Sequence, residues 1–163
     1  MRLFPAIAAA AALLAAAAPA NAQDRLARGK YLVSIMDCGG CHMPGAFTGK
    51  PDTSRFLGGE SIGFEIPGLG IFYPPNLTPD RDTGLGKWSE ADIVKAVRTG
   101  QRPDGRELAP AMPWRAYAAL SDGDARALAA YLKSLKPVAN KVPEPVGAGQ
   151  PAKAPYMTVV MPK

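Results

Sequence analysis

Two cysteines and one histidine lie within five consecutive residues, Cys38-Gly39-Gly40-Cys41-His42, and the sequence contains no other residue of either type. Two thiols at this spacing can form a redox-active dithiol, but such a pair needs a helix N-terminus after a strand to lower its thiol pKa. The residues before the first cysteine do not have the pattern of a strand. The cluster therefore favours a cofactor or metal site over a bare dithiol.

The spacing Cys-x-x-Cys-His matches the sequence at which a c-type haem is covalently attached to a protein. Two thiols separated by two residues on a helical turn reach the two vinyl groups on one edge of a porphyrin. His42 then lies under the ring, where its nitrogen can bind the iron. Gly39 and Gly40 keep bulky side chains away from the ring. The sequence therefore predicts one haem c with its iron, held by Cys38 and Cys41, with His42 as an iron ligand.

The iron of such a haem has a second axial position, and the sequence offers Met112 for it. Ligation by two histidines is excluded because His42 has no counterpart. Met112 follows after enough chain to wrap the porphyrin, and nearby prolines on both sides restrict its backbone, which lowers the entropy cost of presenting the sulfur. The alternatives are a methionine that only fills the core and ligation by Met157 or Met161 near the C-terminus.

Residues 1–22 have the pattern of a secretory signal peptide. Arg2 provides the positive start, an alanine-rich apolar stretch follows, and Ala20-Asn21-Ala22 is a small-x-small cleavage pattern. No later apolar run approaches the roughly 20 residues that a membrane-spanning helix needs. The sequence therefore predicts export to the periplasm and a mature chain that does not span the membrane.

The remaining chain has the size of one domain and a mildly basic character. The whole sequence has 163 residues and a formal net charge of +5, with the basic residues scattered, so we exclude a nucleic-acid partner. Its 17 glycines and 17 prolines, with only 7% aromatic residues, predict a loop-rich fold that needs a cofactor to supplement a thin core. We expect the domain to span residues 23–138. A proline-rich tail, residues 139–163, either lies along the domain or attaches to a partner subunit.

Helical periodicity and capping residues predict helices separated by long loops. The expected helical segments span residues 24–36, 89–100, 114–120 and 121–136. Residues 43–87 lack a long period, apart from a short extended piece within 66–73, and such a loop is unusual in a compact domain unless it wraps a ligand. We expect it to wrap the haem, with a carbonyl within 43–56 accepting a hydrogen bond from His42.

The order of these elements resembles the class I c-type cytochromes, which bind a single haem, over roughly residues 24–138. The resemblance implies an all-α domain, the small cytochrome c fold, in which long loops wrap one covalent haem. In that fold the N- and C-terminal helices cross, and a small residue at the crossing permits their close approach. The first expected helix carries Gly29 and the last carries Ala129 and Ala130.

The middle of the chain contains three characteristic segments, Asn76-Leu77-Thr78-Pro79-Asp80, Gly86-Lys87-Trp88-Ser89 and Pro110-Ala111-Met112-Pro113-Trp114. They resemble the cytochrome c modules that serve membrane-bound periplasmic dehydrogenases for alcohols, aldehydes and sugar acids. This resemblance implies Met112 as the sixth ligand, and Trp88 and Tyr73 as hydrogen-bond partners of the haem propionates. Those subunits commonly carry three such modules, whereas this chain carries one.

The combined prediction is an electron carrier rather than an enzyme, with no catalytic residues. The resemblance implies redox partner proteins, namely a periplasmic or membrane-bound dehydrogenase and a terminal oxidase. Methionine opposite histidine suits electron transfer because it raises the reduction potential. The alternative is a haem-based enzyme or gas-binding sensor with an open sixth coordination site.

Overall fold

The first helix of the domain spans residues 22–35 and leads directly into α2 (Cys38–His42). The computed structural model describes residues 22–162, so the predicted signal peptide, residues 1–22, lies outside the described residues apart from its last one. No helix in this described part of the chain is both long and apolar enough to cross a bilayer.

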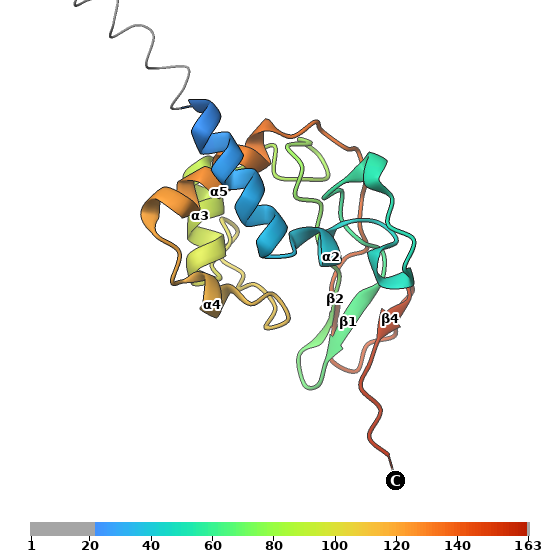
Figure 1. Cartoon of the computed structure of the whole chain (residues 1–163). Helices are drawn as coiled ribbons and strands as arrows, with labels where there is room; N and C mark the ends of the chain where they lie inside the picture. The colour runs from blue at the N-terminus through green and yellow to red at the C-terminus, as the bar shows by residue number, and fades with distance from the viewer. Residues whose placement is uncertain (1–21, 163) are drawn as a thin grey trace, which may run out of the picture.

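The first helix crosses the last helix, α5 (Asp122–Ser134), at close range (Figure 1). A Cβ atom at Gly29 would lie 2.1 Å from the carbonyl oxygen of Ala127 and 2.6 Å from Cβ of Tyr131. Any side chain at this position would push the two backbones apart, so the contact requires glycine. The predicted crossing of the N- and C-terminal helices is confirmed, and Gly29 is the small residue that permits it.

α3 (Glu90–Thr99) packs against α5. Its first turn is closed by a capping box, in which the Ser89 hydroxyl accepts a hydrogen bond from the N–H of Asp92 and the Asp92 carboxylate accepts one from the N–H of Ser89. Gly100 ends the helix in the left-handed conformation, φ 75°, and the short helix α4 (Trp114–Tyr117) packs against α3. The main core cluster consists of buried apolar residues from helices and loops, Leu32, Val33, Leu57, Leu85, Ile93, Val97, Leu128, Ala129 and Leu132.

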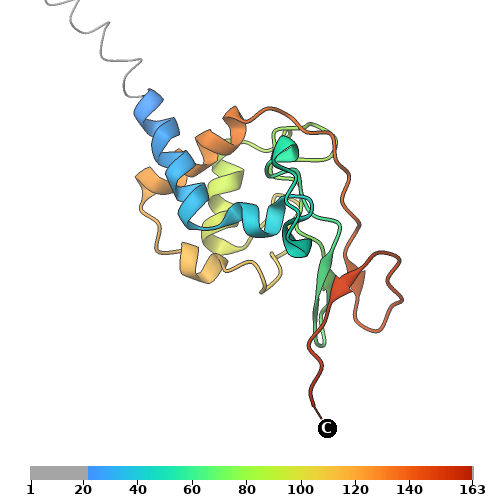
Figure 2. The same ribbon diagram turned by 45° about the vertical axis from the view of Figure 1, so that its right-hand side comes forward.

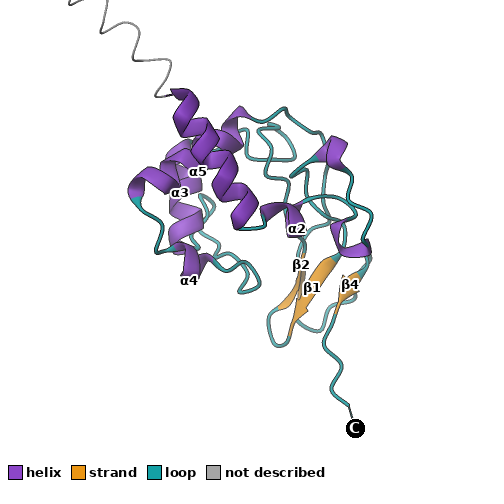
Figure 3. Cartoon of the chain, in the orientation of Figure 1, coloured by secondary structure: helices purple, strands orange, loops and turns teal. Residues whose placement is uncertain are grey.

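A small sheet lies beside the helices, and it corrects the expectation of an all-α domain (Figure 3). The order in the sheet is β3-β2-β1-β4, and its strands are β1 (Gly63–Ile66), β2 (Gly70–Phe72), β3 (Val146–Gly147) and β4 (Tyr156–Met157). β1 and β2 form an antiparallel hairpin, β3 pairs antiparallel with β2, and β4 pairs parallel with β1. β2 lies inside the short extended piece that the sequence predicts. Periodicity does not predict the rest, because β3 and β4 are too short to show an alternating pattern.

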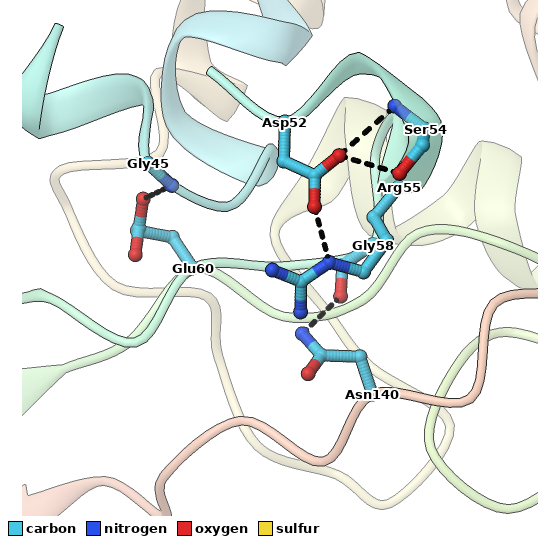
Figure 4. Close-up of polar contacts among 7 residues, drawn as sticks. All are labelled: Gly45, Asp52, Ser54, Arg55, Gly58, Glu60 and Asn140. Carbon is cyan, nitrogen blue, oxygen red and sulfur yellow. Dashed lines mark hydrogen bonds and ion pairs between the residues drawn. The ribbon is translucent and has the colours of Figure 1, made fainter. Parts of the chain in front are cut away.

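Polar side chains hold the long loop between α2 and α3 (Figure 4). Asp52 accepts hydrogen bonds from the backbone N–H and hydroxyl of Ser54 and from the guanidinium group of Arg55. The carboxylate of Glu60, which is 2% exposed, accepts a hydrogen bond of 2.7 Å from the N–H of Gly45. The loop therefore satisfies its backbone groups without long regular elements. It contains two 3₁₀ turns, η1 (Ala46–Thr48) and η2 (Thr53–Arg55).

The segment after α5 lies along the domain and contributes β3 and β4 to the sheet. The side-chain amide of Asn140 donates a hydrogen bond of 2.8 Å to the carbonyl of Gly58 (Figure 4). The hydroxyl of Tyr73 donates one of 3.2 Å to the carbonyl of Ala154. Of the two arrangements expected for the tail, these contacts show the one along the domain. The boundary after residue 138 stays a prediction.

Candidate functional site

The two cysteines lie on α2, whose N-terminal cap is Asp37. Asp37 has a left-handed backbone, φ 50°, and its carboxylate accepts a hydrogen bond of 3.2 Å from the N–H of Gly40. A Cβ atom at Gly40 would lie 2.3 Å from that carboxylate, whereas one at Gly39 would come no closer than 3.3 Å to any neighbour. Gly40 is therefore required by the cap itself, in addition to the space that both glycines leave for a ring.

Cys38 and Cys41 are free thiols, one helical turn apart and partly buried. Burial raises the pKa of the Cys38 thiol to about 11, and burial also raises the pKa of Cys41. Both thiols are therefore protonated at neutral pH, whereas redox-active dithiols have a lowered thiol pKa. The environment of these thiols argues against a bare redox dithiol and is compatible with covalent attachment of a cofactor.

His42 is buried, 7% exposed, and its Nδ1 lies 2.8 Å from the carbonyl oxygen of Pro75. A carbonyl can only accept a hydrogen bond, so the ring proton lies on Nδ1 and Nε2 keeps its lone pair. Burial also lowers the pKa of His42, which favours the neutral ring. A neutral histidine with its second nitrogen held by a carbonyl is the form that binds metals.

The carbonyl that orients His42 comes from a different segment than the sequence predicts. The prediction of a carbonyl within 43–56 is wrong, because Pro75 occupies that position. Pro75 is held near α2 by pairing between two distant parts of the loop, in which the N–H of Leu77 donates to the carbonyl of Leu57 at 2.8 Å. No local sequence pattern indicates such a pairing.

Met112 lies in a separate loop, residues 101–113, which runs below α2 in both Figure 1 and Figure 2. The N–H of Leu108 donates a hydrogen bond of 2.7 Å to the carbonyl of Gly100. At the other end of the loop the ring of Trp114 packs so closely on Gly100 that a Cβ there would lie 2.5 Å from the ring. The structure thus places the two cysteines and the histidine together on α2, and it fixes the half-buried Met112 on a loop tied to the end of α3.

The two aromatic residues implied as partners of the haem propionates differ in their surroundings. The hydroxyl of Tyr73 already donates to Ala154 in the tail. Trp88 packs against the core, its carbonyl accepts a hydrogen bond of 2.8 Å from the ammonium group of Lys133, and the guanidinium carbon of Arg102 lies 5.5 Å from its ring centroid. The surroundings of Trp88 therefore suit an anionic group better than those of Tyr73.

Arg102 and Trp114 are two further candidates, to which the sequence analysis assigns no role at the haem. The Nε1 of Trp114 is buried and has no hydrogen-bond partner within residues 22–162. The Nε of Arg102 is also buried without a hydrogen bond, although it lies 3.4 Å from the carboxylate of Asp104 in an ion pair. Buried donors are normally satisfied, so both suit a group that brings its own acceptor atoms, as the propionates of haem do. Arginine in a polar loop and tryptophan in a helix give no sequence signal of this kind. The residues present fit a covalently held haem.

The family model described as Cytochrome c matches residues 26–136. The chain belongs to the cytochrome c family. Covalently bound haem c, iron and electron transport follow from this membership, which confirms the prediction of an electron carrier. The cysteines and histidine of α2 lie inside the matched region of this cytochrome c chain, as does the loop with Met112.

Several relatives of this cytochrome c chain are subunits of dehydrogenases. The chain is 40% identical to the cytochrome c subunit of alcohol dehydrogenase (quinone) from Gluconobacter oxydans, over 77% of this chain and 26% of that protein. It is 42% identical to the gluconate 2-dehydrogenase cytochrome c subunit from Pantoea cypripedii, over 77% of this chain and 27% of that protein. A diheme cytochrome c-type protein from Cereibacter sphaeroides is 32% identical over 68% of this chain and 36% of its own length. The chain therefore spans about a quarter of the two dehydrogenase subunits.

Proposed function

We propose that this cytochrome c is a periplasmic electron carrier with a single haem, whose iron is bound between His42 and Met112. The observation that carries the proposal is the state of His42. Its ring is buried and neutral, its Nδ1 proton is donated to Pro75, and its Nε2 is left with a lone pair on the helix that carries both thiols. This arrangement supports one attached porphyrin with an axial histidine.

A haem held here supplies reversible one-electron exchange at its iron. Cys38 and Cys41 would hold it to α2, and His42 would provide a nitrogen to its iron. Met112, presented by a proline-flanked loop, would provide a thioether, which raises the reduction potential. The same sulfur would leave small ligands no position on the iron, which separates a carrier from a gas sensor.

For the redox partners we propose a periplasmic or membrane-bound dehydrogenase as electron donor and a terminal oxidase as acceptor. The donor is supported by the names of the relatives, which are cytochrome subunits of dehydrogenases. One Cys-x-x-Cys-His segment in the whole sequence supports one haem rather than several. The predicted signal peptide, residues 1–22, supports the periplasmic location.

The intact mass of the protein exported to the periplasm tests the proposal. We expect a polypeptide that begins after residue 22 and carries the added mass of one haem, which denaturation in acid does not remove. Replacing both Cys38 and Cys41 by serine is expected to abolish the covalent mass. A wild-type mass without haem would contradict the proposal, and a mass that includes residues 1–22 would contradict the predicted cleavage.

A further inference from the structure

Residues 138–142 form a strap that lies outside the family match, which ends at residue 136. Both polar backbone groups of Val138 form hydrogen bonds. The N–H donates one of 3.0 Å to the hydroxyl of Thr78, and the carbonyl accepts one of 2.7 Å from the side chain of Asn76. Two residues further on, the side chain of Asn140 donates a hydrogen bond of 2.8 Å to the carbonyl of Gly58. The strap therefore binds two different loop segments at once.

These two segments are the ones that hold His42. Gly59 is next to Gly58, which the strap contacts, and its N–H donates a hydrogen bond of 2.8 Å to the carbonyl of His42. The carbonyl of Pro75, next to the strap contact at Asn76, lies 2.8 Å from His42 Nδ1. On each segment, the strap contact is one residue away from the contact with His42.

The connection is rigid because its polar groups are buried and satisfied. Asn76 is 1% exposed and Thr78 is fully buried. The side-chain oxygen of Asn76 accepts two hydrogen bonds from Thr78, one of 2.9 Å from the N–H and one of 2.7 Å from the hydroxyl. The side-chain nitrogen of Asn76 donates to the carbonyl of Val138 and to the hydroxyl of Thr83. In a buried network of this kind, the loss of one partner leaves another group unsatisfied and displaces it.

We propose that the strap is part of the haem site, and that it positions the Pro75 carbonyl against Nδ1 of His42. The inference rests on the proposed role of His42 as an axial ligand. A hydrogen bond from Nδ1 makes the ring a more basic ligand, and a more basic ligand stabilises the oxidised iron. Loosening the strap therefore raises the reduction potential, and it does so through Gly58 and Asn76, the loop residues that the strap binds.

The substitutions Thr78→Val and Thr78→Ser test this proposal as a matched pair. Thr78→Val keeps the volume but removes the hydroxyl that binds Val138 and Asn76. In the haem-loaded protein we expect a higher midpoint potential. We also expect the His42 Nδ1 proton to exchange with solvent roughly tenfold faster, as the loss of about one buried hydrogen bond would allow. Thr78→Ser keeps the hydroxyl and is expected to restore both values.

A second variant, Asn140→Ala, removes the other arm of the strap at a half-buried position and is expected to shift both values in the same direction. It decides the question if Thr78→Val does not yield haem-loaded protein. Unchanged potential and proton exchange, with only a lower melting temperature, would overturn the proposal and leave the strap a purely structural role. A wild-type protein without covalent haem is a different failure, because it contradicts the proposed function before any variant is compared.

Discussion

Met112 is half-buried in a turn where its N–H donates to the carbonyl of Ala109 and its own carbonyl accepts from the N–H of Trp114. Replacing it by alanine removes the thioether and leaves the thiols and His42 untouched. We expect haem attachment to persist, the far-red sulfur-to-iron absorption band to vanish, and the potential to fall by a substantial part of the roughly 0.8 V range that axial ligands span. Absorption spectra and potentiometry measure both effects.

The matched controls for this substitution are Met157→Ala and Met161→Ala, which alter exposed methionines of the C-terminal segment. Neither control is expected to change the band or the potential. If Met112→Ala keeps the far-red band and one of the controls loses it, the ligand is that other methionine and the assignment to Met112 is wrong.

Among the carboxyl groups of the long loop, that of Asp52 is expected to have a pKa well below its ordinary value. Hydrogen bonds from Ser54, followed by those from Arg55, lower its pKa from 3.8 to about 2. Because the pKa of this carboxyl group is lower in the folded protein, its ionised form stabilises the folded turn above pH 3.8. This contribution to stability is lost as pH falls through about 2. Amide chemical shifts of residues 53–55 are expected to titrate near the lower value. A midpoint near 3.8 would show that the turn does not bind the carboxylate in solution.

At the scale of the elements, the crossing of the first helix with α5 depends on Gly29. A methyl group there would lie 2.1 Å from the carbonyl oxygen of Ala127. We expect Gly29→Ala to destabilise the protein by about 1–3 kcal/mol, the usual cost of overpacking. Denaturant unfolding followed by circular dichroism measures this change.

Gly123 provides the matched control, since it lies in α5 and a Cβ there would meet nothing closer than 3.8 Å. Gly123→Ala is expected to stabilise the helix by about 0.5–1 kcal/mol because alanine loses less backbone entropy. If both substitutions have the same effect, the close approach at Gly29 is not a feature of the protein in solution.

The helices and their caps were predictable because their signals are local. Ser89 and Gly100 lie at the two ends of one apolar stretch, and the structure has α3 between them. The full sheet was not predictable, because β1 and β2 pair with strands of the tail that lie between 75 and 93 residues away in the sequence. The same limit applies to the site: α2 is a local motif, whereas the Pro75 carbonyl reaches His42 only through the folded loop.

At the scale of the whole molecule, the apolar C-terminal residues are the most exposed of their kind in the described chain. Val159, Val160 and Met161 are between 77% and 81% exposed, and they begin one residue after the end of the edge strand β4. Deleting residues 145–163 removes β3 and β4 but keeps the strap at 138–142. We expect haem attachment and the methionine-ligated spectrum to persist, and reduction by dehydrogenase-containing membranes to slow several-fold.

The control for this deletion is direct chemical reduction, which does not depend on docking and is expected to proceed at the wild-type rate. Loss of the low-spin spectrum in the truncated protein would show that residues 145–163 belong to the haem domain. Unchanged reduction by the membranes would show that this segment does not bind the partner.

The absorption spectrum of the reduced wild-type protein, recorded before and after addition of carbon monoxide, tests most directly whether the iron of this cytochrome c is bound on both sides, as we propose. The proposed ligation by His42 and Met112 leaves no free position on the iron, so the reduced spectrum is expected to stay unchanged and the oxidised protein to show the far-red band. Rapid formation of a carbon monoxide complex in the native reduced protein would contradict this ligation. It would show an open sixth position, as in a haem-based enzyme or gas sensor.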